Sequence, residues 1–152
     1  MSFYDKKYNI IYTQGNFNNH LGVPLTLLRI KPDTEVAIVE MGANHPGEIA
    51  QLCKLAQPDF GIITNIGKAH IEGFGSYEGV IKTKNELYQY LKTKGERQKA
   101  IVFVNGNNEL LMNLSEGMER VVYKSTDNRQ LTTDNSPYLK VVWNNNRINI
   151  ID

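Results

Sequence analysis

The sequence predicts an α/β fold, in which an open and mostly parallel sheet is flanked by helices and followed by a small antiparallel β appendage. Short apolar runs alternate with helical patterns over the first two thirds of the 152 residues. This alternation is typical of parallel strands joined by crossover helices. Beyond residue 119 the strand-like runs follow one another without a helical pattern between them. We therefore expect a single domain, with residues 1–118 forming the α/β part and residues 119–152 the β-rich appendage.

The alternating part contains a series of predicted strands and helices. The strands are the apolar runs Tyr8–Thr13, Val36–Met41, Phe60–Asn65 and Lys99–Asn105. The helices are the stretches Leu21–Ile30, Pro46–Ala56, Tyr77–Lys92 and Asn108–Ser115. The run Val36–Met41 has the composition expected of a parallel strand that is covered on both faces. We expect Phe60–Asn65 to be a buried strand as well.

The appendage is predicted from runs rich in β-branched and aromatic residues. Its strands are Arg120–Lys124, Tyr138–Trp143 and Arg147–Ile151, and the polar stretch Ser125–Pro137 separates the first two. Asn144–Asn146 is a plausible hairpin turn, because asparagine tolerates positive φ angles. We expect these strands to be antiparallel.

Composition excludes several classes of protein. The net charge is +1, from 17 basic and 16 acidic residues, which gives no electrostatic reason to expect nucleic acid or an anionic membrane as partner. No apolar run is long enough to span a membrane, and the first residues do not resemble a signal peptide. The single cysteine, Cys53, permits no intrachain disulfide and indicates a reducing, cytoplasmic environment. Cys53 lies in a helical apolar pattern, so we expect it to be a core residue.

Polar residues and glycines follow each of the four strands of the predicted parallel sheet. In open α/β sheets ligands bind outside the carboxyl ends of the strands. The residues in question are Gly15 and Asn16, Gly42 and Asn44, Gly67 and His70, and Gly106 and Asn107. Any single turn is polar, but four such ends at one edge favour a ligand site over ordinary turns.

Glu40 stands at the end of an otherwise apolar run. A carboxylate in this position costs free energy unless it is paired, protonated or bound to a cation. One interpretation is a strand-end carboxylate that caps the following helix or pairs with a lysine. The other is a ligand for a hard cation such as Mg²⁺, which prefers oxygen ligands together with substrate phosphates.

Lys84 and His70 are two further candidates. Lys84 occupies the missing position in the apolar stripe of the helix Tyr77–Lys92, which places it on the inward face. Its stem could be buried while its ammonium group reaches water or a carboxylate, or it could enter the site as a phosphate contact or in modified form. His70 follows a predicted buried strand in a glycine-rich loop, where a structural role and a ligand role are about equally supported.

Four segments in order along the chain resemble a known family. They are Gly15–Leu28, Glu40–Ile49, Ile63–Ser76 and Lys82–Tyr88, and they resemble the central, ATP-handling domain of Mur ligases. The run NFNNHLGVP is most similar to the branch that adds D-alanyl-D-alanine. Because the four segments keep their order and spacing, the resemblance is far more specific than one short motif.

The resemblance implies an ATP-dependent, ADP-forming amide ligase of peptidoglycan precursor synthesis that uses Mg²⁺. Its substrates would be UDP-MurNAc-tripeptide and D-Ala-D-Ala, joined through an acyl phosphate. In such a family Glu40 matches the residue that binds the magnesium between the ATP phosphates. His70 matches a ligand of a second magnesium, and Lys84 matches a lysine that is carbamylated and thereby becomes an anion near the metals.

The resemblance also assigns three asparagines. Asn16 and Asn19 fall in the segment near the transferred phosphate and the acyl substrate, and Asn105 matches an asparagine of the adenine pocket. Acceptor choice is left open, since folylpolyglutamate and cyanophycin synthetases belong to the same superfamily. A non-catalytic module that binds a nucleotide or a protein partner also remains an alternative.

One expected motif is absent from the sequence. A phosphate loop of the form G-x-x-x-x-G-K-S/T does not occur, and the only Gly-Lys pair, Gly67-Lys68, is followed by Ala69. We therefore expect an incomplete central domain that lacks the family's first strand and phosphate loop, and an isolated chain without activity. An uncovered sheet edge and apolar surface would also promote self-association.

Overall fold

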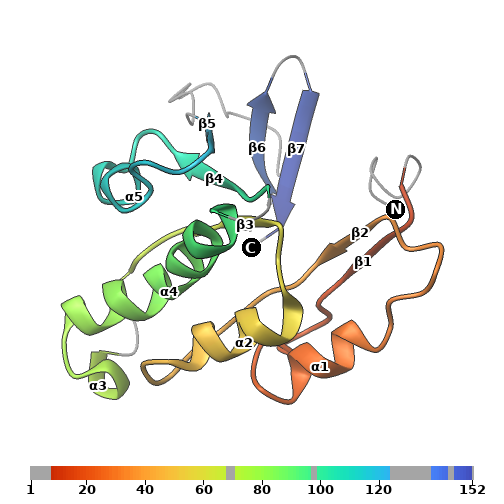
Figure 1. The fold of residues 1–152 in the computed structure, drawn as a ribbon, viewed down its shortest axis with the longest axis horizontal. Helices are drawn as coiled ribbons and strands as arrows, with labels where there is room; N and C mark the ends of the chain where they lie inside the picture. Colours follow the sequence, from red (N-terminus) through yellow and green to blue (C-terminus); the bar gives the residue numbers. More distant parts are fainter. Residues whose placement is uncertain (1–7, 68–70, 97–98, 124–137, 144–145, 152) are drawn as a thin grey trace. The chain divides into compact units, whose positions relative to one another are not determined.

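The computed structural model describes residues 8–67, 71–96, 99–123, 138–143 and 146–151 (Figure 1). The chain divides into two compact units, each described by itself below. The first unit comprises Met1–Pro58 and Ile66–Tyr90, and the second comprises Asp59–Asn65 and Leu91–Asp152. None of the helices among the described residues is long and apolar enough to cross a lipid bilayer.

The first unit contains a pair of parallel strands and the helices that follow them. Strands β1 (Ile10–Tyr12) and β2 (Val36–Ile38) are parallel neighbours, with Ile10 opposite Val36 (Figure 1). The helices are α1 (Gly22–Leu27), α2 (Glu48–Ala56), α3 (Ile71–Phe74) and the first part of α4 (Tyr77–Gly95). The order of strands and helices agrees with the sequence prediction, except that the short helix α3 was not predicted.

The core of the first unit lies between α1, α2 and the segment after β2. Its buried members are Val23, Ile49, Leu52 and Cys53, with Leu27, Val39, Met41, Ala43, Leu87 and Tyr90 packed against them. Cys53 is fully buried, which confirms the prediction that it is a core residue. Desolvation by this burial raises the pKa of the Cys53 thiol to about 12.

Helix α1 begins where the chain approaches itself closely. The side-chain oxygen of Asn19 accepts hydrogen bonds from the backbone N–H groups of Leu21 (3.1 Å) and Gly22 (3.0 Å). N–H groups at the start of a helix have no acceptor inside the helix, so the Asn19 side chain satisfies them. A Cβ atom at Gly22 would overlap the backbone of Phe17. Glycine at this position therefore lets the loop pack against the start of the helix.

The second unit is built on a parallel sheet in the order β3-β4-β5. The strands are β3 (Phe60–Ile62), β4 (Ile101–Asn105) and β5 (Arg120–Tyr123). Helix α5 (Glu109–Leu114) connects β4 to β5, and it starts at Asn108, whose side chain accepts a hydrogen bond from the Leu111 N–H. The prediction that the strand Arg120–Lys124 belongs to the antiparallel appendage was wrong. The crossover through α5 returns the chain in the direction of β4, so β5 pairs with β4 in parallel.

The remaining strands form the antiparallel part. Strands β6 (Tyr138–Trp143) and β7 (Asn146–Ile151) pair antiparallel, with Tyr138 opposite Ile151 (Figure 1). This pairing confirms the predicted antiparallel appendage for these two strands. The polar stretch Ser125–Pro137 and the first two residues of the predicted turn Asn144–Asn146 lie outside the described residues.

Burial differs between the predicted strands. In β4, Val102 and Val104 are completely buried, as expected of a strand with neighbours on both edges. In β2, Val36 is 38% exposed and Ile38 is 57% exposed, so the prediction of a strand covered on both faces was wrong. Among the described residues β2 pairs only with β1, which leaves much of its apolar surface accessible. Strand β3 is also only partly buried, since Gly61 is its one buried residue.

Candidate functional site at the ends of the first two strands

Glu40 lies two residues beyond the end of β2 and is held by groups that follow β1. Its Oε1 accepts a hydrogen bond of 2.7 Å from the side-chain nitrogen of Asn18. Its backbone N–H donates to the hydroxyl of Thr13 at 2.9 Å. Glu40 is exposed, so the prediction that its carboxylate ends a buried strand was wrong. The reason is that the strand ladder stops at Ile38 and the chain turns toward Asn18.

Asn18 is the asparagine that joins the two strand ends. Besides its side-chain bond to Glu40, its carbonyl oxygen accepts a hydrogen bond of 2.7 Å from the N–H of Gly42. A Cβ atom at Gly42 would lie 3.0 Å from Cγ and Nδ2 of Asn18. Gly42 therefore provides the space into which the Asn18 amide fits. The sequence prediction did not include Asn18 among the site residues, because the run of asparagines gave no sign of which amide points to Glu40.

The two predicted asparagines of this segment have other surroundings. Asn19 uses its side-chain oxygen to accept the two hydrogen bonds at the start of α1. Asn16 is exposed, and its carbonyl oxygen accepts a hydrogen bond of 2.8 Å from the N–H of Asn18. The predicted contacts of Asn16 and Asn19 with phosphate or acyl substrate stay predictions.

Two carboxylates fix the loop that follows Glu40. Glu48 accepts hydrogen bonds from the N–H groups of Asn44 (2.7 Å) and His45 (3.1 Å). These bonds, with that from Asn44 the largest contribution, lower the pKa of Glu48. Glu86 of α4 accepts hydrogen bonds from the N–H groups of Gly47 (2.7 Å) and Ala50 (2.9 Å), at the start of α2. The loop is thus anchored both locally and to α4.

Lys84 lies on α4, two residues before Glu86. It is exposed, so the prediction that it occupies the inward stripe of the helix was wrong. Thr83 occupies that position instead and is fully buried. Its hydroxyl donates a hydrogen bond of 2.9 Å to the carbonyl oxygen of Gly79 in the preceding turn, which satisfies the buried polar group. Partial desolvation nevertheless lowers the pKa of Lys84.

His70 and Asn105 are the two remaining candidates. His70 lies outside the described residues. Asn105 is the last residue of β4 in the second unit. Its side-chain oxygen accepts a hydrogen bond of 3.0 Å from the N–H of Asn107, and its carbonyl oxygen accepts one of 3.0 Å from Asn108. Of the four strand ends singled out in the sequence, the first unit brings together those of β1 and β2, through the contact between Asn18 and Glu40.

The donor set near Glu40 can be tested against the needs of a metal ion. The described part of the chain holds no group of three or more His, Cys, Asp or Glu residues that could bind a metal by themselves. Mg²⁺ is commonly bound by one or two carboxylates together with water and substrate phosphates. An exposed carboxylate such as Glu40, with a neutral amide as partner, fits that kind of site.

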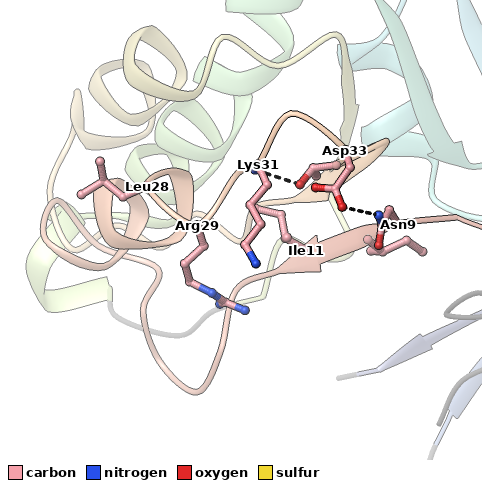
Figure 2. A pocket seen from close by; sticks show the side chains of 8 residues that line it. Asn9, Ile11, Leu28, Arg29, Lys31 and Asp33 are labelled. Atoms are coloured by element: carbon pink, nitrogen blue, oxygen red, sulfur yellow. Dashed lines mark hydrogen bonds between the residues drawn. The ribbon is translucent and has the colours of Figure 1, made fainter.

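A separate hollow lies at the opposite end of the strands. It has a volume of about 370 Å³ and is lined by Asn9, Ile10, Ile11, Leu28, Arg29, Lys31, Asp33 and Thr34 (Figure 2). The side chain of Asn9 donates to Asp33 at 3.0 Å, and the N–H of Lys31 donates to the Thr34 hydroxyl at 3.0 Å. Ile10 and Ile11 belong to the start of β1, and the other lining residues precede β1 or lie between α1 and β2. The hollow is therefore distinct from the carboxyl-end site at Glu40.

Known proteins identify the family. Residues 1–150 match the family described as Mur ligase middle domain. The chain belongs to this family. The resemblance expected from the four segments is thereby confirmed, as is the α/β fold class. Among solved structures, "Crystal structure I of MurF from Acinetobacter baumannii" is similar with a TM-score of 0.71 and 28% sequence identity, covering 81% of this chain and 28% of that chain.

Individual relatives point to one branch of the Mur ligases. The UDP-N-acetylmuramoyl-tripeptide--D-alanyl-D-alanine ligase of Escherichia coli is 44% identical over 105 residues, covering 69% of this chain and 22% of that protein. The Haemophilus influenzae ligase of the same name is 50% identical over 86 residues, covering 57% of this chain and 19% of that protein. A MurF ligase structure from Thermotoga maritima, in complex with ADP, is 32% identical with a TM-score of 0.65, covering 79% of this chain and 27% of that chain. The chain spans about a fifth of the length of the curated relatives it matches.

Proposed function

We propose that this chain is the part of an ATP-dependent, ADP-forming amide ligase that handles ATP during the addition of D-Ala-D-Ala to UDP-MurNAc-tripeptide. The observation that carries the proposal is the constellation at the end of β2, in which Glu40 is presented to solvent by Asn18. Support comes from relatives named for this reaction and from the ADP-bound Thermotoga maritima structure. A cytoplasmic location in a bacterium agrees with the single free cysteine and with the bacterial relatives.

The reaction would proceed in two steps. The substrate carboxylate takes the terminal phosphoryl group of ATP, so that an acyl phosphate forms and ADP leaves. The amine of D-Ala-D-Ala then attacks the acyl carbon, an amide bond forms and phosphate leaves. Mg²⁺, when bound, neutralises the charge that develops on the phosphate oxygens. Glu40 would be a ligand of the ion that accompanies the ATP phosphates, and His70 and Lys84 would contribute to a second ion.

Lys84 would contribute as a carbamate. Its neutral amine attacks CO₂, an N–C bond forms, one C=O π bond becomes a C–O⁻ group and a proton is released. Desolvation lowers the pKa of Lys84, which raises the fraction of neutral amine at a given pH. The product is an anion, which is the charge that a ligand of a cation requires. Asn16 and Asn19 would contact phosphate or acyl substrate, and Asn105 the adenine ring.

The proposal is tested with a full-length ligase that carries this segment. We expect ADP release that depends on both UDP-MurNAc-tripeptide and D-Ala-D-Ala, because those substrates match the branch that the chain resembles. Turnover with glutamate or another acceptor, and none with D-Ala-D-Ala, would assign the chain to a different ligase of the superfamily. The 152-residue chain alone is expected to show no turnover, since its sequence contains no phosphate loop. Heat of Mg-ATP binding without turnover would identify a nucleotide-binding module.

We also propose that the chain associates with itself when it is isolated. Helix α1 and its flanks expose Leu21, Leu25 and Leu28, about one leucine per turn, and Leu28 is 81% exposed. An uncovered row of leucines favours association. Sedimentation velocity over a range of protein concentrations should show a rising mean mass, and a constant monomer mass would contradict the proposal.

A further inference from the structure

The Glu40 carboxylate is exposed, yet it has a defined orientation. A glutamate side chain at the surface ordinarily samples several rotamers. Here the 2.7 Å bond from the Asn18 amide selects one of them. Because a cation binds best to a carboxylate that already points toward it, this bond should strengthen metal binding. The backbone of Glu40 is fixed independently, by its N–H bond to Thr13.

We propose that Asn18 is a positioning residue, which orients Glu40 for the cation that accompanies the nucleotide phosphates, and that Gly42 is needed because the Asn18 amide fills the space beside it. The proposal rests on the proposed function, in that it names how the same site is organised. It adds two residues, Asn18 and Gly42, whose roles follow from contacts among the described residues.

The chemistry of the partner supports a positioning role. An asparagine amide is a neutral donor, so it orients the carboxylate without cancelling its negative charge. A lysine or arginine at the same place would form an ion pair and compete with the metal for Glu40. Asn18 also leaves the remaining lone pairs of the carboxylate, about three of the four, for other ligands.

The backbone contacts of Asn18 allow its positioning role to be tested without unfolding the loop. The carbonyl oxygen of Asn18 accepts the bond from the Gly42 N–H, and this bond does not depend on the side chain at residue 18. Asn18→Ala should therefore keep the loop in place and remove only the bond to Glu40. In Gly42→Ala the new Cβ would lie 3.0 Å from the Asn18 amide. The amide must then shift by a few tenths of an ångström. We expect this shift to disturb its bond to Glu40, so Gly42→Ala should reproduce the effect of Asn18→Ala.

The experiment measures cation binding directly in the full-length ligase. Mn²⁺, used as a spin-active substitute for Mg²⁺, is titrated with ADP present, and free Mn²⁺ is followed by electron paramagnetic resonance. We expect Asn18→Ala and Gly42→Ala each to weaken Mn²⁺ binding by about 10–100-fold, as typical for loss of a group that orients a metal ligand. The matched control is Asn113→Ala, at an exposed asparagine of α5 in the second unit, which should leave Mn²⁺ binding unchanged.

A double variant that combines Asn18→Ala with Gly42→Ala makes the test decisive. Once the Asn18 side chain is absent, Gly42→Ala should weaken binding no further, because the two substitutions act through one contact. Additive losses, or wild-type affinity in Asn18→Ala, would overturn the positioning role. A folded wild-type ligase that binds Mn²⁺ but does not use D-Ala-D-Ala would refute the proposed substrate and leave the positioning test intact. A wild-type ligase that binds no Mn²⁺ with ADP would overturn both.

Discussion

The end of β2 and the end of β4 each carry a predicted site residue, Glu40 for the magnesium ion and Asn105 for the adenine ring, but the two residues are held in different ways. Glu40 is bonded to Asn18, which is 22 residues away in the sequence. Asn105 is bonded to Asn107, two residues further along its own turn. A bond within a turn forms wherever an asparagine starts such a turn. A bond between two strand ends exists only when the fold brings them together, so the Glu40 contact is stronger evidence for a built site.

The largest expected effect tests this difference directly. In a full-length ligase, Glu40→Gln removes the negative charge but keeps the size of the side chain. We expect turnover to fall roughly 100-fold or more, because electrostatic stabilisation of the phosphoryl transfer is lost. Steady-state ADP release at saturating substrates measures the effect.

Asn105→Ala is the matched variant at the other strand end. It should raise the KM for ATP and cost about 0.5–1.5 kcal/mol of stability through the lost turn hydrogen bond. If Asn105→Ala reduces turnover as much as Glu40→Gln, the distinction between the two strand ends fails.

An intermediate effect concerns the helix that supports the β2 end. Glu86 of α4 anchors the loop after Glu40, and Lys84 lies on the same helix. With ¹³C-labelled bicarbonate, NMR of the chain should show a carbamate signal that Lys84→Arg abolishes. Because the pKa of Lys84 is lowered, the signal should appear at a lower pH than for an ordinary lysine and grow as pH rises. A signal that persists in Lys84→Arg would place the carbamate elsewhere.

The smallest expected effect is a dependence of stability on pH. The Asn44 and His45 N–H groups lower the folded-state pKa of Glu48 below its ordinary value of 4.5. The resulting stability is present above pH 4.5 and is lost as pH falls through the folded-state pKa. Glu48→Gln should make the acid limb of urea-unfolding measurements less steep. An unchanged acid limb would show that the loop beside Glu40 does not depend on this carboxylate.

The sequence predicted the elements better than their surroundings. Apolar runs located β1 to β4 because a strand of a few residues needs only a local pattern. They overestimated the length of β2. The N–H groups of Glu40 and Gly42 donate to the Thr13 hydroxyl and the Asn18 carbonyl instead of to a neighbouring strand. The direction of β5 was missed, since a strand-like run contains no information about its neighbour.

The candidate site shows the same limit at the level of single residues. Helical periodicity placed Lys84 inward, but positions 83 and 84 fit the spacing nearly equally well. Threonine is tolerated inside because its hydroxyl bonds to Gly79 in its own helix. Glu40 could be identified from its position after an apolar run. Its partner Asn18 could not, because three asparagines within four residues differ only in where the fold directs their side chains.

Burial of Cys53 gives the protein an internal reporter. It is the only cysteine in the sequence, it lies in the core between α1 and α2, and its thiol has a pKa of about 12. The thiolate is the nucleophile that attacks an alkylating reagent, and it reacts only when the reagent can reach it. The folded chain should therefore resist labelling, and the rate of labelling in mild denaturant measures how often the core beside the Glu40 loop opens. The labelling rate of Cys53 can then show whether nucleotide and metal ion make opening of that core less frequent.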